Sequence, residues 1–263
     1  MIKLVALDLD DTLLNTKLEI SPNTAQAIKQ AIAKGVTVTL ATGRMYCSAL
    51  PFALDLGMEV PLITYHGALV KTSLTKEVIY HRTIPLELAR LITQVARNLG
   101  FHLNIYMNDQ LYAEKDNPHI AGYTNLARVP YREVPDLLQA LVHEPDKLMI
   151  IDAEQKLDEL AITLQELVGN KLHITKSKPH FLEITHPQAT KGQAIAALVK
   201  HLGIERSQVM AVGDSYNDLD MLQYAGIGVA MGNSRPAIQQ QADYVTKSND
   251  EDGVAEAFYK FVL

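Results

Sequence analysis

Strand-like apolar runs alternate with helix-like stretches in the first part of this chain, and this alternation restricts the possible folds more than any other feature. The run from Ile2 to Leu9 is apolar at both odd and even positions, as expected of a parallel strand covered on both faces. Ser21-Pro22 predicts the start of a helix that stops at Gly35, and strands are predicted at Val36 to Leu40 and Pro61 to Tyr65. This order predicts an α/β fold with a Rossmann-like, doubly wound parallel sheet.

The middle of the chain has a different pattern. A helix-like stretch from Leu86 to Leu99 is followed by strand-like runs on both sides of Asn108-Asp109, and further helix and strand signals reach Thr185. Strand pairs of this kind predict an antiparallel α+β unit. From Pro187 the alternating pattern returns. We therefore expect a discontinuous core domain, residues 1–83 and 187–263, with an inserted α/β cap domain at residues 84–186.

Charge and composition favour a small-molecule partner. The formal net charge of −6 and the pI near 5.8 argue against a chain built to bind nucleic acid or an anionic membrane. A single cysteine, Cys47, excludes an internal disulfide and any multi-thiolate metal site within the chain. We see neither a signal-peptide pattern nor an apolar run of membrane-spanning length. We therefore expect a cytoplasmic protein.

Polar side chains follow three strands of the predicted core sheet. Asp8 and Asp10 follow the first strand, Thr42 follows the second, and Asp214 follows a strand predicted at Val209 to Val212. The carboxyl ends of parallel strands share one edge of a sheet, and ligands of open α/β sheets bind outside that edge. These distant positions are therefore expected to meet in one site.

Carboxylates brought together in this way repel one another unless a cation neutralises them. An all-oxygen set of ligands favours a hard divalent ion such as Mg²⁺, which commonly joins carboxylates to a substrate phosphate. Thr42-Gly43 offers a hydroxyl and a backbone amide just before a helix, and Lys191 lies at the start of another helix. The sequence thus predicts a site for magnesium and a phosphate group.

Four ordered motifs make a family resemblance specific. They are Asp8-Leu9-Asp10-Asp11-Thr12, Thr42-Gly43-Arg44, Lys191-Gly192, and the segment from Gly213 to Asp218, which reads GDSYND. Together they resemble the motifs of the haloacid dehalogenase superfamily. The large insertion between the second and third motifs is similar to that of its Cof-type, sugar-phosphatase-like branch.

The resemblance implies a role for each matching residue. Asp8 would be the nucleophile that forms an aspartyl-phosphate, and Asp10 would protonate the leaving oxygen and then activate water. Magnesium would be held by Asp8, the backbone carbonyl of Asp10, and Asp214. The phosphoryl group would be bound by Thr42, Gly43, Lys191 and Asn217. Two further residues would support the site without contacting the phosphate. Thr12 would brace the loop, and Asp218 would orient Lys191 or the metal-bound waters.

Two positions depart from the commonest pattern of the resembled family. Asp11 is often Gly there, and His66 is often Asn in a loop that faces the cap. Asp11 lies outside the DxDxT positions, so we expect no effect on the chemistry. His66 could alter substrate contacts.

The expected function is hydrolysis of small phosphate monoesters, such as sugar phosphates, by a magnesium-dependent phosphatase. Two alternatives stay open: a phosphotransferase or phosphomutase that uses the same aspartyl-phosphate, and a catalytically silent sensor of a phosphorylated metabolite. The set of Asp8, Asp10, Lys191 and Asp214 argues against the sensor, because a binder needs neither a nucleophile nor a proton carrier. The sequence leaves the physiological substrate, the selecting cap residues and the oligomeric state open.

Overall fold

The computed structural model describes residues 1–57 and 59–263, which form two compact units. Among these residues no helix is both long enough and apolar enough to cross a membrane. The first unit comprises Met1–Gly43, Ala49–His81 and Thr190–Leu263, and the second comprises Arg44–Ser48 and Arg82–Ala189.

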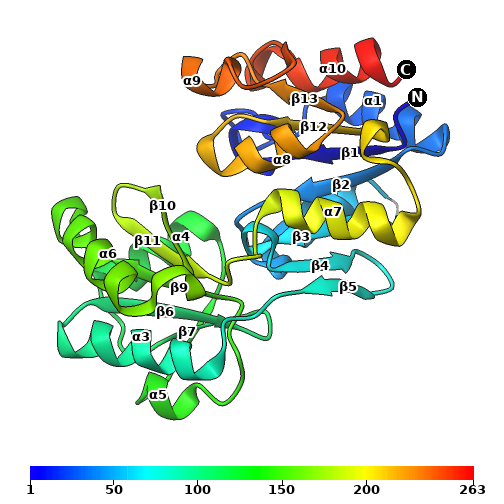
Figure 1. The fold of residues 1–263 in the computed structure, drawn as a ribbon. Coiled ribbons are helices and arrows are strands. Elements are labelled where there is room, and N and C mark those ends of the chain that lie inside the picture. The colour runs from blue at the N-terminus through cyan, green and yellow to red at the C-terminus, as the bar shows by residue number, and fades with distance from the viewer. Residues whose placement is uncertain (58) are drawn as a thin grey trace. The chain divides into compact units, whose positions relative to one another are not determined.

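The second unit is mainly an insertion in the first, as the colour sequence along the chain in Figure 1 shows. The predicted α/β class, with a parallel-sheet core and an inserted α/β unit, is confirmed. The domain limits expected after residues 83 and 186 stay a prediction.

Eight strands form the sheet of the first unit, in the order β14-β13-β12-β1-β2-β3-β4-β5. The pairs from β14 to β3 are parallel, whereas β4 and β5 join antiparallel at one edge. The bounds are β1 Leu4–Leu7, β2 Thr37–Ala41, β3 Pro61–Thr64, β4 Leu69–Thr72, β5 Val78–His81, β12 Val209–Gly213, β13 Ile227–Ala230 and β14 Tyr244–Val245.

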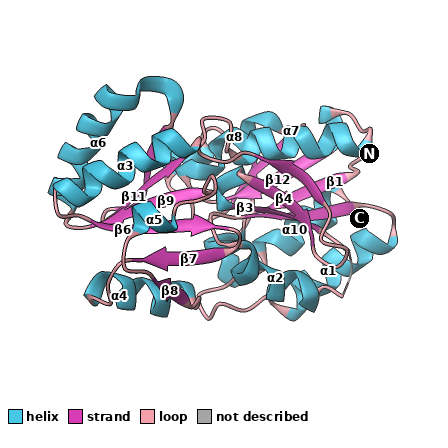
Figure 2. Cartoon of the chain, turned by 90° about the horizontal axis from the view of Figure 1, so that it is seen from below, coloured by secondary structure: helices cyan, strands magenta, loops and turns pink. Residues whose placement is uncertain are grey.

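Helices cover both faces of this sheet, with α7 and α8 on one face and α1 and α10 on the other (Figure 2). Leu4 and Ala6 of β1 pack in one buried cluster with Ile195 and Leu198 of α7. Strand β1 is buried at every position, as its continuous apolar run predicted. The bounds are α1 Pro22–Ala33, α2 Tyr46–Asp55, α7 Lys191–Leu202, α8 Leu219–Tyr224, α9 Pro236–Gln239 and α10 Gly253–Phe261.

Helix α1 begins and ends where the sequence predicted. The Ser21 hydroxyl accepts a hydrogen bond from the Thr24 amide at 3.1 Å, and Pro22 occupies the first turn. Gly35, with φ of +83°, ends the turn that follows the helix. The cap and stop signals are therefore confirmed.

The sheet of the second unit has the strand order β10-β11-β9-β6-β7-β8. All neighbours are antiparallel except β7 and β8. The Asn108-Asp109 turn between β6 and β7 has φ of 53° and 57°, the left-handed pair typical of a tight hairpin. The bounds are β6 His102–Met107, β7 Gln110–Ala113, β8 Tyr131–Glu133, β9 Lys147–Ile151, β10 His173–Lys178, β11 Phe181–Thr185, α3 Leu86–Asn98, α4 Pro118–Ala127, α5 Leu137–Ala140 and α6 Glu154–Val168.

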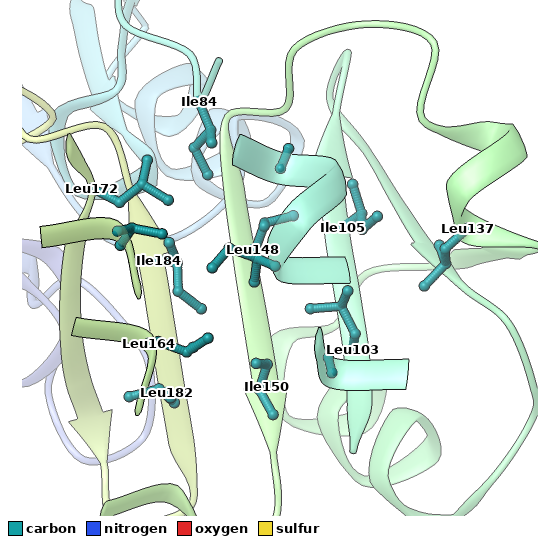
Figure 3. Packing of buried hydrophobic residues seen from close by; sticks show 14 of the residues in the cluster. Ile84, Leu103, Ile105, Leu137, Leu148, Ile150, Leu164, Leu172, Leu182 and Ile184 are labelled. Atoms are coloured by element: carbon teal, nitrogen blue, oxygen red, sulfur yellow. The ribbon is translucent and has the colours of Figure 1, made fainter. Parts of the chain in front are cut away.

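One apolar face of this second sheet packs against α3, α5 and α6. Figure 3 shows alternate residues of neighbouring strands, such as Leu103, Leu148 and Ile184, pointing into the same cluster. Leu164 from α6 meets them. The second unit therefore has a hydrophobic core of its own.

Some elements were not predicted from the sequence, among them β4, β5, α4 and β8. Strands β4 and β5 form a short hairpin at the sheet edge. Lys71 interrupts the apolar run of β4, and the two end residues of β5 are exposed, so neither strand resembles a buried strand of the core. Helix α4 starts with Asn117 as its cap and Pro118 in its first turn, but it buries only Ile120. Its weak apolar pattern hid the helix, although the capping signal was present.

Leu148→Ala should lower the free energy of unfolding by about 2–5 kcal/mol, because it leaves a cavity in the buried cluster of the second unit. Urea denaturation followed by circular dichroism measures the change. Leu167→Ala, at a helix position that is 48% exposed, is the matched control and should change stability little. Equal effects of the two substitutions would contradict the assigned core.

Candidate active site

Three neighbouring strands of the first unit deliver the predicted site residues to one edge of the sheet. Strand β1 lies between β12 and β2, with Leu7 in register with Val212 and with Leu40. Asp8, Asp214 and Thr42 directly follow these strands. The convergence expected from the sequence is therefore present.

The chain makes a wide turn after β1. The amides of Leu13 and Leu14 donate to the carbonyls of Asp8 and Leu9, at 3.3 and 2.9 Å. Within this turn the buried Thr12 hydroxyl donates to Oδ1 of Asp214 at 3.0 Å. Thr12 thus ties the turn after β1 to the carboxylate that follows β12.

Lys191 is the first residue of α7, and its side chain is fully buried. Its ammonium group donates to Oδ1 of Asp8 at 2.5 Å and to Oδ1 of Asp218 at 2.6 Å. Thr190 caps the helix, accepting a hydrogen bond from the amide of Gln193. The start of α7 therefore fixes a buried cation between two carboxylates.

Asp218 uses its other oxygen to shape the loop after β12. Oδ2 accepts hydrogen bonds from the amides of Asp214 and Ser215, each at 3.0 Å. Its side chain is 0% exposed, so both oxygens are satisfied within the protein. Asp218 therefore orients Lys191 and the Asp214 loop together.

The charges in this cluster do not balance. Burial, followed by the charge of Asp218, raises the pKa of Asp8 well above its usual range, although Lys191 offsets part of the effect. The same two causes raise the pKa of Asp214 to about 6. Burial alone would lower the pKa of Lys191, but Asp218 and Asp8 raise it above its ordinary value. An additional cation would relieve the excess negative charge.

The donor set suits a hard cation. Oxygens of Asp8, Asp214 and Asp218 lie within 4.8 Å of one another. Because Asp218 is already bonded to Lys191 and to two amides, Asp8 and Asp214 are the carboxylates best able to take a metal. Oxygen donors without sulfur or imidazole fit Mg²⁺.

The residues predicted to bind phosphate, apart from Lys191, differ in how deeply they are buried. Thr42 is buried at 1% exposure, and its amide donates to the carbonyl of Ile63 at 2.8 Å. Gly43 lies against the imidazole of His66. Asn217 is exposed, and its Oδ1 accepts a hydrogen bond from the Ser215 hydroxyl at 2.5 Å.

The two remaining acids of the first motif differ in exposure. Asp10 is half-buried, whereas Asp11 is exposed and has φ of 59°. This left-handed position is one that Gly, Asn and Asp tolerate best, and it explains why an aspartate fits the wide turn. The backbone conformation of the turn therefore accounts for an aspartate at position 11.

Asp220 supports the site and was missed in the sequence. Its Oδ2 accepts a hydrogen bond from the Gly192 amide at 2.7 Å, in the first turn of α7. A side chain on Gly192 would also meet the carbonyl oxygen of Asp220 at 2.8 Å. The spacing of Asp218 and Asp220 at the start of α8 was the only sequence signal.

A cavity of about 490 Å³ lies within the second unit. It is lined by residues such as Phe101, His102 and His119, and its Arg97 is already paired with Glu114 and Asp136. It contains none of the acids or phosphate-binding residues predicted from the sequence. The predicted site residues therefore lie outside this cavity.

Comparisons with known proteins identify the family of this chain and relatives with the same fold. The family model described as haloacid dehalogenase-like hydrolase matches residues 5–258. The 5-amino-6-(5-phospho-D-ribitylamino)uracil phosphatase YcsE of Bacillus subtilis (strain 168) is 34% identical over 264 residues, covering 100% of this chain and 96% of the relative.

Solved structures show the same fold. A haloacid dehalogenase-like hydrolase from Bacteroides thetaiotaomicron is 32% identical, with a TM-score of 0.92 and 99% of each chain covered. The subclass IIB sugar phosphatase BT4131 is 26% identical, with a TM-score of 0.85 and 98% of each chain covered.

The raised pKa of Asp214 predicts a pH-dependent stability in the metal-free protein. A carboxyl whose pKa is raised by folding binds its proton more tightly in the folded state, so its stabilising contribution is present at low pH and is lost as pH rises. Relative to Asp214→Asn, the free energy of unfolding of the original protein should fall between about pH 4 and about pH 7.

Urea denaturation in the presence of a chelator measures this difference. Asp55→Asn is the control, because Asp55 is an exposed residue of α2 outside the cluster. Its variant should follow the pH dependence of the original protein. A difference from Asp214→Asn that stays flat or grows with pH would contradict the electrostatic account.

Proposed function

This chain belongs to the haloacid dehalogenase-like hydrolase family, and on that premise we propose that it hydrolyses small phosphate monoesters with Mg²⁺, through an aspartyl-phosphate on Asp8. As an enzyme it is a phosphatase of this family. The observation that carries the proposal is the buried contact of Lys191 with both Asp8 and Asp218. A purely structural salt bridge between Lys191 and these two acids would not need a third carboxylate, Asp214, close by.

Asp8 is the nucleophile in this proposal. One of its carboxylate oxygens attacks phosphorus while the bond from phosphorus to the ester oxygen breaks. Asp10 gives its proton to the departing oxygen. Asp10 then takes a proton from water, which attacks phosphorus and releases inorganic phosphate and the free Asp8 carboxylate.

Asp8, Asp214 and the backbone carbonyl of Asp10 would hold the Mg²⁺ ion. When bound, the ion supplies positive charge that offsets the clustered carboxylates and the substrate phosphate. Thr12 keeps Asp214 in place through its 3.0 Å hydrogen bond. Asp218 orients Lys191 without itself facing the substrate.

Lys191, Thr42, the amide of Gly43 and Asn217 would bind the phosphoryl group. Lys191 is rigid, because two carboxylates and its burial fix the ammonium group before any ligand arrives. Such preorganised donors stabilise charge that develops in the transition state. The Oδ1 of Asn217 accepts a hydrogen bond from Ser215, so its side-chain amide nitrogen would be the atom that donates to the phosphate.

The substrate class is a small phosphorylated metabolite. The relatives named above include a phosphatase for a phosphoribitylamino-uracil and a sugar phosphatase. Both substrates are phosphate esters of polyhydroxylated carbon chains. We propose an ester of this kind for the present enzyme, with the loop around His66 helping to select the leaving group.

Asp8→Asn should lower kcat for an aryl phosphate by at least about 10³-fold, because an amide cannot attack phosphorus or leave from it. Release of inorganic phosphate, measured with Mg²⁺ present, checks this. Asp11→Asn is the matched control, since Asp11 is exposed in the same turn, and kcat should stay within about threefold.

The same assay with and without an added sugar distinguishes hydrolysis from phosphoryl transfer. Release of phosphate at an unchanged rate supports the hydrolase. Transfer to the sugar without release would identify a phosphotransferase instead. Unchanged turnover in Asp8→Asn would contradict the nucleophile assignment.

A further inference from the structure

The turn between β3 and β4 has an unusual backbone. Tyr65, His66 and Gly67 all have positive φ, at 51°, 60° and 105°. Two of these three residues carry side chains that disfavour this conformation, so the surrounding contacts must maintain it. Strain of this kind is found more often at functional sites than elsewhere.

His66 lies directly on the second motif. A Cβ atom placed on Gly43 would be 2.3 Å from Cε1 and 2.4 Å from Nε2 of His66. The imidazole therefore occupies the space that a side chain at position 43 would need. The amide of His66 also donates to the carbonyl of Thr42 at 3.1 Å. Ring and backbone together restrain Thr42-Gly43.

Gly67 lies equally close to the third motif. A Cβ atom on Gly67 would be 2.2 Å from the carbonyl oxygen of Thr190 and 3.0 Å from the amide nitrogen of Lys191. The missing side chain lets the turn reach the backbone at the start of α7. Consecutive residues of one strained turn thus contact two segments that are far apart in the sequence.

We propose that His66 is a positioning residue for the phosphate site, whose ring holds Thr42-Gly43 at a set spacing from Lys191. This inference rests on the proposed function, because it assumes that Thr42, Gly43 and Lys191 bind the phosphoryl group. The turn sets the distance between the two segments, because His66 contacts Gly43 and Gly67 contacts the backbone of Thr190 and Lys191. Removing the ring lets Thr42-Gly43 move, and small misplacements of binding groups are costly.

The test is a double-mutant cycle of His66→Ala, Gly43→Ala and the double variant. Calorimetry with inorganic phosphate and Mg²⁺ gives the dissociation constant, and an aryl phosphate gives kcat and KM. Each single substitution should weaken phosphate binding about tenfold and raise KM more than it lowers kcat. In the double variant the methyl group introduced at position 43 partly fills the space left by the imidazole ring. The loss of phosphate affinity in the double variant should therefore not exceed the loss in the worse single variant.

Gly122→Ala is the control, because Gly122 lies within α4 with no atom near its missing side chain. It should leave phosphate binding and turnover unchanged. Thermal unfolding of every variant identifies any that fail to fold, and His66→Ala then decides the matter alone. Binding within twofold of the original protein in His66→Ala, or losses that multiply in the double variant, would overturn the proposal.

Failure of the proposed function gives a different result. If the original protein releases no phosphate from any aryl ester, the hydrolase proposal fails, yet the binding constants for inorganic phosphate still measure the effect of His66. If the original protein hydrolyses the ester and His66→Ala matches it in KM and phosphate affinity, only the positioning role fails.

Discussion

The ammonium group of Lys191, buried between Asp8 and Asp218, is the interaction on which the rest of the site depends. Removing one partner of a buried ion pair typically costs about 3–5 kcal/mol, because the remaining charge loses its compensation. Here one cation meets two carboxylates, and a third, Asp214, lies close by. The cluster therefore carries excess negative charge, and burial together with that charge raises the pKa of Asp8 and of Asp214. A site with this imbalance is suited to a divalent cation and poorly suited to a purely structural role.

The parallel sheet makes this arrangement possible. Asp8 follows β1, Asp214 follows β12 and Thr42 follows β2, and the order β12-β1-β2 brings these three strand ends side by side. Packing fixes the strands, because every residue of β1 and β12 is buried. Helix α7 then supplies Lys191 from its first turn, while Asp218 and Asp220 connect that turn to the loop and helix after β12. The well-packed sheet thus holds the unbalanced charges of the site together at one of its edges.

The sequence predicted the parts that depend on local patterns. Continuous apolar runs revealed the buried strands, Ser21 and Pro22 marked the start of α1, and Asn108-Asp109 marked a hairpin. The convergence of Asp8, Thr42 and Asp214 followed from the rule that parallel strands end together. Contacts between distant segments could not be predicted in this way. The strained turn at His66 and the bond from Gly192 to Asp220 depend on three-dimensional packing, and the helix α4 has too weak an apolar face to be visible in the sequence.

Trapping the covalent intermediate tests the central claim most directly. Borohydride reduces an acyl phosphate to an alcohol, so enzyme that is turning over an aryl phosphate with Mg²⁺ can be quenched, reduced and digested for mass spectrometry. The account predicts reduction at Asp8, dependent on substrate, and none at Asp10 or Asp214. Reduction at another carboxylate, or full turnover with no trapped residue at position 8, would contradict the assignment of Asp8 as the nucleophile.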